Sequence, residues 1–207
     1  MLLTVTAMDK SAHKLRREIA QLAAKIIAVD GESDYLVAKR KAALRLGTKP
    51  DKSMPSNLEI EEALFDYQRL FQGEAQPAAL DTLRRTAMEA MTFLKEFEPR
   101  LVGPVLAGNA TRHSEIVLHL FCERAEDIAF FLGDKGVPYL HTERTLKVRA
   151  NEAVDLPAYR FLAGHTAVVL IVFSNTRKNF RPLSPIDGKP MQRANLRQVE
   201  ALLQKGV

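Results

Sequence analysis

The segment GPVLAGNATRHSEIVLHLF, residues 103–121, combines residue types that could bind a phosphate or a metal ion. Its second half has the composition of a β-strand, and residues two apart on a strand point to the same face. One face would therefore present Glu115, Val117, His119 and Phe121. Two carboxylates at this spacing could hold the divalent ions used in nucleotidyl transfer. This face offers only one, so the pattern favours binding over metal-assisted catalysis.

Two glycines, Gly103 and Gly108, precede this strand, and Ser114 ends the polar turn between them and Glu115. Glycine lets a ligand approach the backbone closely, and free N–H groups attract anions. The segment 103–108, with Ser114 beside it, could therefore receive a phosphate. The alternative is that the glycines only shape a turn, and both interpretations stay open.

Three histidines, His113, His119 and His165, could converge near the same place. Histidine and glutamate are zinc ligands in type, but the spacing of these residues is not that of a metal-binding signature. The sequence therefore predicts no metal site, and it favours histidines that lie in the core or on the surface. Cys122, which follows the strand, is predicted to be a buried small apolar residue.

The net charge of +5 is concentrated at the C-terminal end. Residues 174–207 hold seven basic side chains against Asp187 and Glu200, which accounts for the whole excess. Such a surplus could attract phosphate or nucleic acid, and the alternative is a solvated tail. The predicted patch beside residues 103–108 consists of Arg177, Lys178, Arg181, Arg193 and Arg197.

Composition limits the class of protein. The 207 residues are 46% hydrophobic and 27% charged, enough to bury one substantial core or two small ones. A single cysteine excludes an intrachain disulfide framework and favours a reducing compartment. No run approaches the roughly 18 apolar residues of a membrane span. We expect a cytoplasmic protein without a membrane partner.

The elements that must position these residues change in character near Pro99. Before it, apolar residues recur at helical spacing in four segments, and Ser56 with Glu59 matches a capping box. After it, residues 100–105, 115–121, 139–149, 159–163 and 167–173 have strand patterns, and the last of these is apolar enough to be buried on both faces. Residues 125–135 and the segment after Asn195 are predicted helices. The interpretation is an α+β chain with a helical region, 1–97, and an α/β core, 98–207.

The run LVGPVLAGNATRHSEIVLHLF resembles the opening motif of the DNA polymerase β-type nucleotidyltransferase superfamily. Gly103, Gly108 and Ser114 match its glycines and serine, and Glu115 takes its first acid position. More closely, the chain looks like an uncharacterised bacterial family with the runs LVGPVLxGxAxRHS, LHLF, RFLAG and SPxDGxPMxRA. The resemblance implies a mixed sheet flanked by helices, in which strands 115–121 and 167–173 are neighbours.

The departures from the superfamily motif bear on function. Val117 replaces the second acid, and Val169 stands where the resemblance implies the third. We therefore expect a degenerate active site and a non-catalytic, regulatory protein that binds a nucleotide, RNA or a protein partner, with no cofactor. One alternative is a divergent Mg²⁺-dependent nucleotidyltransferase using Glu115 with Asp127 or Glu143. The other is a protein-interaction module built on the helical region. Oligomeric state stays open, and Glu115 is expected to be solvated.

Overall fold

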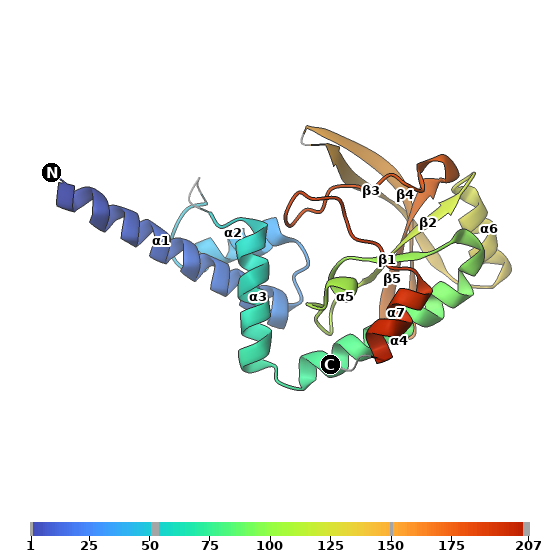
Figure 1. The fold of residues 1–207 in the computed structure, drawn as a ribbon, viewed down its shortest axis with the longest axis horizontal. Helices are drawn as coiled ribbons and strands as arrows, with labels where there is room; N and C mark the ends of the chain where they lie inside the picture. Colours follow the sequence, from blue (N-terminus) through green and yellow to red (C-terminus); the bar gives the residue numbers. More distant parts are fainter. Residues whose placement is uncertain (1, 51–53, 150, 205–207) are drawn as a thin grey trace. The chain divides into compact units, whose positions relative to one another are not determined.

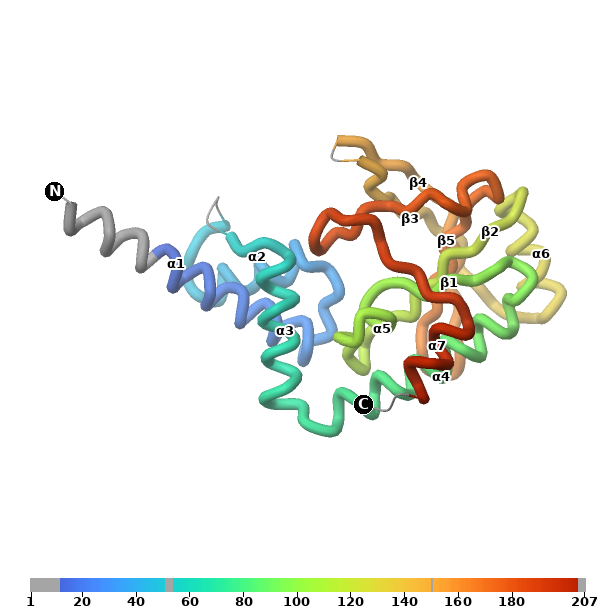
Figure 2. Tube along the Cα trace, viewed as in Figure 1, coloured from blue at the N-terminus to red at the C-terminus, as the bar shows by residue number. Residues whose placement is uncertain are grey.

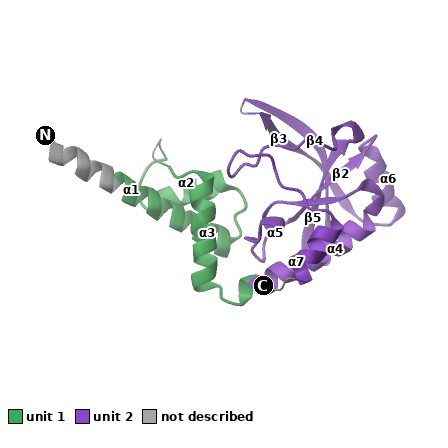
Figure 3. Ribbon diagram, in the orientation of Figure 1, with its two compact units in different colours: residues 1–76 green, residues 77–207 purple. Residues whose placement is uncertain are grey.

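In the computed structural model, residues 2–50, 54–149 and 151–204 are described, with side chains from residue 12 onward (Figure 1). The chain divides into two compact units, Met1–Gln76 and Pro77–Val207 (Figure 3). The first contains the N-terminal helices, and the second contains a five-stranded mixed sheet with helices. The α+β class predicted from the sequence is confirmed.

Two helices of the first unit begin at side-chain caps that are visible in the sequence. The Asp34 carboxylate accepts hydrogen bonds from the N–H groups of Leu36 and Val37. Ser56 and Glu59 form the predicted capping box, with Glu59 N donating to Ser56 Oγ over 3.2 Å and Ser56 N donating to Glu59 Oε2 over 2.7 Å. The elements are α1 (Leu2–Lys25), the π-helical turn η1 (Ile26–Asp30), α2 (Tyr35–Arg45) and α3 (Asn57–Phe71).

The core of the first unit is small and aliphatic. Ile19 and Ile26 pack with Ile60 and Leu64, because residues three or four apart on a helix share a face. Gly31 follows η1 with φ of 75°, a left-handed conformation that glycine adopts without a Cβ clash. The helical segment therefore ends at this glycine.

The second unit is organised around a sheet of order β1-β2-β5-β4-β3. β2 and β5 are parallel neighbours, with Val117 opposite Val169, and every other pair is antiparallel. The predicted adjacency of these two strands is confirmed. The strands are β1 (Arg100–Val102), β2 (Ile116–Cys122), β3 (Tyr139–Arg149), β4 (Glu152–Ala163) and β5 (Thr166–Ser174).

Two strands differ in length from the prediction. β1 ends at Val102 rather than at residue 105, because Gly103 turns the chain with φ of 72° and Pro104 begins a short helix. β4 begins at Glu152, seven residues before the predicted start at Tyr159. Pro157 makes this half of the strand look unlike a sheet element, but pairing with β5 begins only at Ala158. A proline is tolerated where the strand has no second neighbour.

Helices pack against one face of this sheet and contribute to its main core. Leu118, Leu120 and Leu170 on this face pack with apolar residues of α4, α6 and α7. Because α4 contributes Leu83 and Met91 to this core, it groups with the sheet unit and not with the helices predicted together as 1–97. The helices are α4 (Ala75–Phe93), η2 (Lys95–Phe97), α5 (Pro104–Ala107), α6 (Glu126–Asp134), η3 (Asn175–Arg177) and α7 (Leu196–Gln204).

The opposite face of the sheet is crossed by residues 178–194, which we call the C-terminal segment (red in Figure 2). Leu183 N donates to the Lys147 carbonyl on β3, at one edge of the sheet. Ala194 exchanges two backbone hydrogen bonds with Leu101 on β1, at the other edge. The C-terminal segment therefore bonds to both outer strands, and Phe180 packs against the small core on this face.

Candidate functional site

The candidate site is the face of the sheet under the C-terminal segment, which we call the β2 odd face. It carries Val117, His119 and Phe121 from β2 and Val169 and Phe173 from β5, because side chains alternate along a strand. Val117 and Val169 lie directly opposite one another. Apart from His119, the side chains that these two strands present on this face are apolar, and Glu115 lies at one end of β2.

At one end, Glu115 is held by two arginines from neighbouring strands. Arg160 on β4 donates from Nε to Glu115 Oε1 over 2.8 Å, and Arg144 on β3 places Nη2 3.5 Å from Oε2. The carboxylate side chain is 32% exposed. The expectation that Glu115 is merely solvated is therefore wrong: its charge is offset by two guanidinium groups. A carboxylate so paired has fewer free lone pairs for a metal ion.

In the middle of the face, His119 is fully buried against Arg193 of the C-terminal segment. Arg193 Nε donates to His119 Nδ1 over 3.0 Å, which places the imidazole proton on Nε2. Burial, together with the positive charge of Arg193, lowers the pKa of His119 to about 3. His119 is therefore a neutral hydrogen-bond acceptor at ordinary pH, and it lies in the core, which is one of the two locations that the sequence favours for these histidines.

Arg193 is bound to this face mainly by aromatic rings. Its guanidinium carbon lies 4.8 Å from the ring centroid of Phe173 and 5.1 Å from that of Phe121. Such cation–π contacts contribute about 0.5–2 kcal/mol each, more as water is excluded. Nη1 donates to the Lys178 carbonyl, whereas Nη2 is buried and finds no hydrogen-bond acceptor among the described residues. The guanidinium thus fastens the C-terminal segment to the sheet.

Arg193, Arg100, Lys178 and Arg181 form a group of four cations with one carboxylate, Glu98, and we call this group the basic cluster. Burial, followed by the positive charges of Arg181 and Arg100, lowers the pKa of Arg193 to about 10. Lys178 and Arg100 both pair with Glu98. Four cations against one carboxylate leave a local charge of +3. Arg181 is exposed and the side chains of Arg100 and Lys178 are about one third exposed, so the cluster faces solvent.

The glycine turn is held by hydrogen bonds within its own loop. Gly103 and Gly108 flank the single helical turn of α5, with φ of 72° and 98°. Ser114 Oγ accepts from the N–H of Thr111, and the exposed His113 ring lies at hydrogen-bond distance from the side chain of Arg112. Helix α5 is one turn long, and these contacts stabilise the loop itself. Of the two open interpretations, the geometry favours the structural one.

The remaining predicted site residues are only partly brought together. Lys178, Arg181 and Arg193 share the basic cluster, whereas Arg177 lies in η3 and Arg197 on α7, whose Leu196 and Val199 pack against the opposite face. The expectation of one patch of five beside residues 103–108 is therefore replaced by a smaller cluster that includes Arg100.

The carboxylates named for the enzyme alternative do not gather around Glu115. Asp127 begins α6, on the opposite face, and pairs with Arg124. Glu143 precedes Arg144 on β3, so it points away from the face where Arg144 meets Glu115. Within the described residues, no group of three or more histidine, cysteine, aspartate and glutamate side chains could hold a metal ion.

The sequence interpretation missed Arg100, Arg144 and Arg160 as members of the charged sites. The sequence contains only a weak signal for Arg144 and Arg160. Each is a charged residue in a strand pattern, and each shares a face of its strand with an apolar residue two positions further along. Their meeting at Glu115 depends on the order of strands and not on any local motif.

Comparison with known proteins places no constraint on this site. A scan of protein-family models and searches of curated proteins and of solved structures found no match to the chain. None of the helices in the described ranges combines the length and apolar character needed to cross a bilayer.

Proposed function

We propose that this protein binds RNA through phosphate contacts at the basic cluster and performs no nucleotidyl transfer, with its sheet unit a nucleotidyltransferase-like core. The observation that carries the proposal is the cluster itself: Arg100, Lys178, Arg181 and Arg193 against Glu98. A half-buried guanidinium whose pKa is lowered by two others is a place where an added anion is stabilised.

The ligand class follows from the chemistry of these donors. Arginine presents planar pairs of N–H groups that match phosphate oxygens, and a cluster of several arginines suits a ligand with repeated phosphates. Phosphate contacts position a nucleic acid without reading its bases. Arg181 is exposed and contributes positive charge to this surface, whereas Phe180 packs against the small core of the same face. We therefore infer binding that depends on charge and not on base sequence.

The absence of catalysis rests on the residues that occupy the β2 odd face. Nucleotidyl transfer through two metal ions needs several carboxylates within a few Å. Here Val117 and Val169 oppose one another, His119 is covered by Arg193, and Glu115 is paired with two arginines. These contacts favour a structural role for this face, which binds the C-terminal segment.

The test combines binding and turnover on one sample. Labelled single-stranded RNA should bind at about 50 mM salt, and incubation with labelled nucleoside triphosphates and Mg²⁺ or Mn²⁺ should give no incorporation into RNA or protein. Incorporation that disappears in Glu115→Gln would establish the divergent enzyme instead. Absence of RNA binding at low salt would overturn the proposal and leave a protein partner as the better hypothesis.

A further inference from the structure

Exposed apolar side chains concentrate in the first unit. Among the described residues, eight of the twelve large apolar side chains that remain exposed lie in Met1–Gln76, although this unit is the smaller one. Leu70 and Phe71 at the end of α3 are 68% and 71% exposed. Contiguous apolar surface on a small unit marks an interaction site, because a solvated protein gains nothing from keeping it open.

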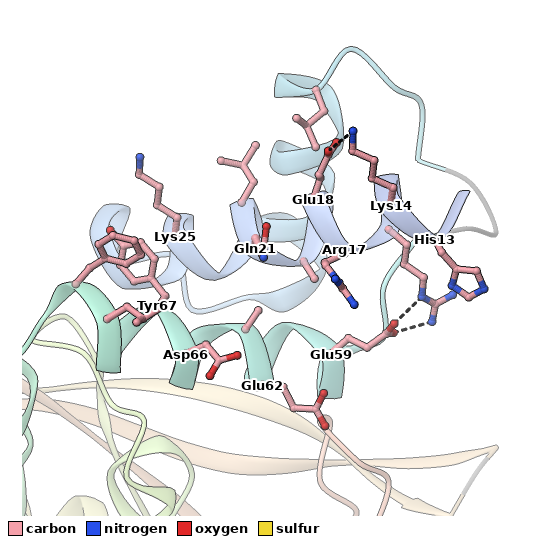
Figure 4. A pocket seen from close by; sticks show the side chains of 17 residues that line it. His13, Lys14, Arg17, Glu18, Gln21, Lys25, Glu59, Glu62, Asp66 and Tyr67 are labelled. Carbon is pink, nitrogen blue, oxygen red and sulfur yellow. Dashed lines mark hydrogen bonds and ion pairs between the residues drawn. The ribbon is translucent and has the colours of Figure 1, made fainter. Parts of the chain in front are cut away.

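Part of this apolar surface lies in an open groove between α1 and α3, which we call the α1–α3 groove (Figure 4). Its volume is about 1510 Å³ and seventeen residues line it. Its apolar lining includes Ala20, Ala63, Tyr67 and Phe71. A standard protein interface uses roughly 20–30 residues from each partner, so the groove approaches the size that a stable contact needs.

The two walls of the groove carry opposite charge. The α1 wall holds Lys14, Arg16, Arg17 and Lys25 with a single carboxylate, Glu18, which leaves a charge of +3. Lys14, Arg17 and Lys25 recur at helical spacing and line one stripe of α1.

The α3 wall holds Glu59, Glu62 and Asp66, for a charge of −3. Arg16 already pairs with Glu59 across the groove over 2.6 Å, and Asp66 pairs with Arg69 on its own helix over 3.0 Å, whereas Arg17 and Glu62 are displayed along the groove (Figure 4). The groove is therefore electrically balanced as a whole but strongly polarised from wall to wall.

We infer that the occupant of the α1–α3 groove is a second copy of this chain, docked groove to groove about a two-fold axis parallel to the groove. That operation lays the basic α1 wall of each copy on the acidic α3 wall of the other, and the apolar linings meet between them. A two-fold axis across the groove would oppose like charges. In such an isologous contact every pair occurs twice, so each complementary pair contributes twice to the dimer.

This dimer is independent of RNA binding, since its residues lie in the first unit and the basic cluster lies in the second. The apolar centre with a charged rim is the usual anatomy of a specific interface. Aromatic anchors such as Tyr67 and Phe71 are the side chains that most often dominate such contacts.

The experiment uses charge reversal in the full-length chain and sedimentation equilibrium between about 1 and 100 μM. The basic-wall variant carries Arg17→Glu and Lys25→Glu, and the acidic-wall variant carries Glu62→Lys and Asp66→Lys. Wild type should have twice the 23.2 kDa mass of the chain. Each variant alone should dimerise at least about 100-fold more weakly, because like charges then face each other. An equimolar mixture of the two should recover the dimer.

Two further variants keep the result interpretable. Arg40→Glu with Lys49→Glu reverses two exposed charges outside the groove lining and should leave the dimer intact. Phe71→Asp replaces a largely exposed side chain, so the unit should stay folded by circular dichroism while the dimer weakens about 10-fold or more. A wild-type monomer throughout the range, a dimer indifferent to both reversals, or a mixture that stays monomeric would each overturn the inference.

Discussion

Lowering the pH should destabilise the sheet unit through one residue, His119. The imidazole is fully buried, its Nδ1 accepts from Arg193, and its pKa is about 3. In the unfolded chain a histidine titrates near 6.5. Protonation of the folded protein would place a proton on Nδ1, break that hydrogen bond and bring a second cation against the guanidinium. At acidic pH the unfolded state therefore binds a proton at this histidine more readily than the folded state does.

The sign and size follow from that difference. Because the folded pKa is depressed, the stability that His119 contributes is complete above about pH 6.5 and declines as pH falls toward 3. At pH 4.5 the pH lies two units below the pKa of the unfolded histidine, and each unit corresponds to 1.36 kcal/mol, so the free energy of unfolding should drop by roughly 2–3 kcal/mol. This is a large part of the roughly 5–15 kcal/mol that holds a domain folded.

The assay is urea unfolding of the full chain at pH 7.5 and 4.5, read by pulsed hydrogen exchange of peptides from β2 and β5. His119→Gln keeps a carbonyl that can accept from Arg193 but cannot titrate, so the loss of unfolding free energy between the two pH values should shrink by about 2 kcal/mol or more. His113→Gln, at an exposed histidine of the same unit, should keep the wild-type loss. Equal pH dependence in wild type and His119→Gln would refute this reasoning.

Three further outcomes are expected from the local contacts. Ser56→Ala removes one side of the capping box and should lower the unfolding free energy of the first unit by about 1 kcal/mol, measured by urea titration with hydrogen exchange of α3 peptides. The hydrogen bond from Arg16 holds the pKa of Glu59 at about 2, so this unit should lose stability as pH falls from about 4.5 toward 2, and Glu59→Gln should abolish that part of the acid dependence. Glu115→Gln should cost about 1 kcal/mol or less, since both ion pairs are partly solvated; a loss above about 3 kcal/mol in the same titration would show that Arg160 depends on the carboxylate far more than its exposure suggests.

Features set by neighbouring residues could be predicted from the sequence. The capping box of Ser56 and Glu59 is satisfied within one turn of helix, and Gly31 ends its helix for a steric reason that needs no tertiary context. The apolar run 167–173 is a strand buried on both faces, because it holds enough β-branched and aromatic side chains to pack in two directions. Its adjacency to β2 was expected from the resemblance rather than from the run itself, and the parallel direction of the pair was not predicted.

The chemistry of the candidate site could not be predicted in the same way. Arg160 reaches Glu115 from 45 residues away, and Arg193 reaches His119 from 74 residues away. Neither contact leaves a local pattern, because each depends on which strands are neighbours and on where the C-terminal segment crosses the sheet. The partner of a side chain such as Arg144 can be identified only when the order of the strands is known.

The central claim is that the basic cluster binds RNA through its phosphates, and the salt dependence of binding tests it most directly. Fluorescence anisotropy of a labelled single-stranded RNA, measured between about 50 and 300 mM salt, should give a slope of log affinity against log salt near −3 for about four phosphates neutralised, at roughly 0.7 per contact. Arg100→Gln with Arg181→Gln should flatten the slope by about 1.4, whereas Arg124→Gln with Arg197→Gln removes the same charge elsewhere on the unit and should leave it unchanged. No binding at the lowest salt, or the same slope in both double variants, would contradict the account.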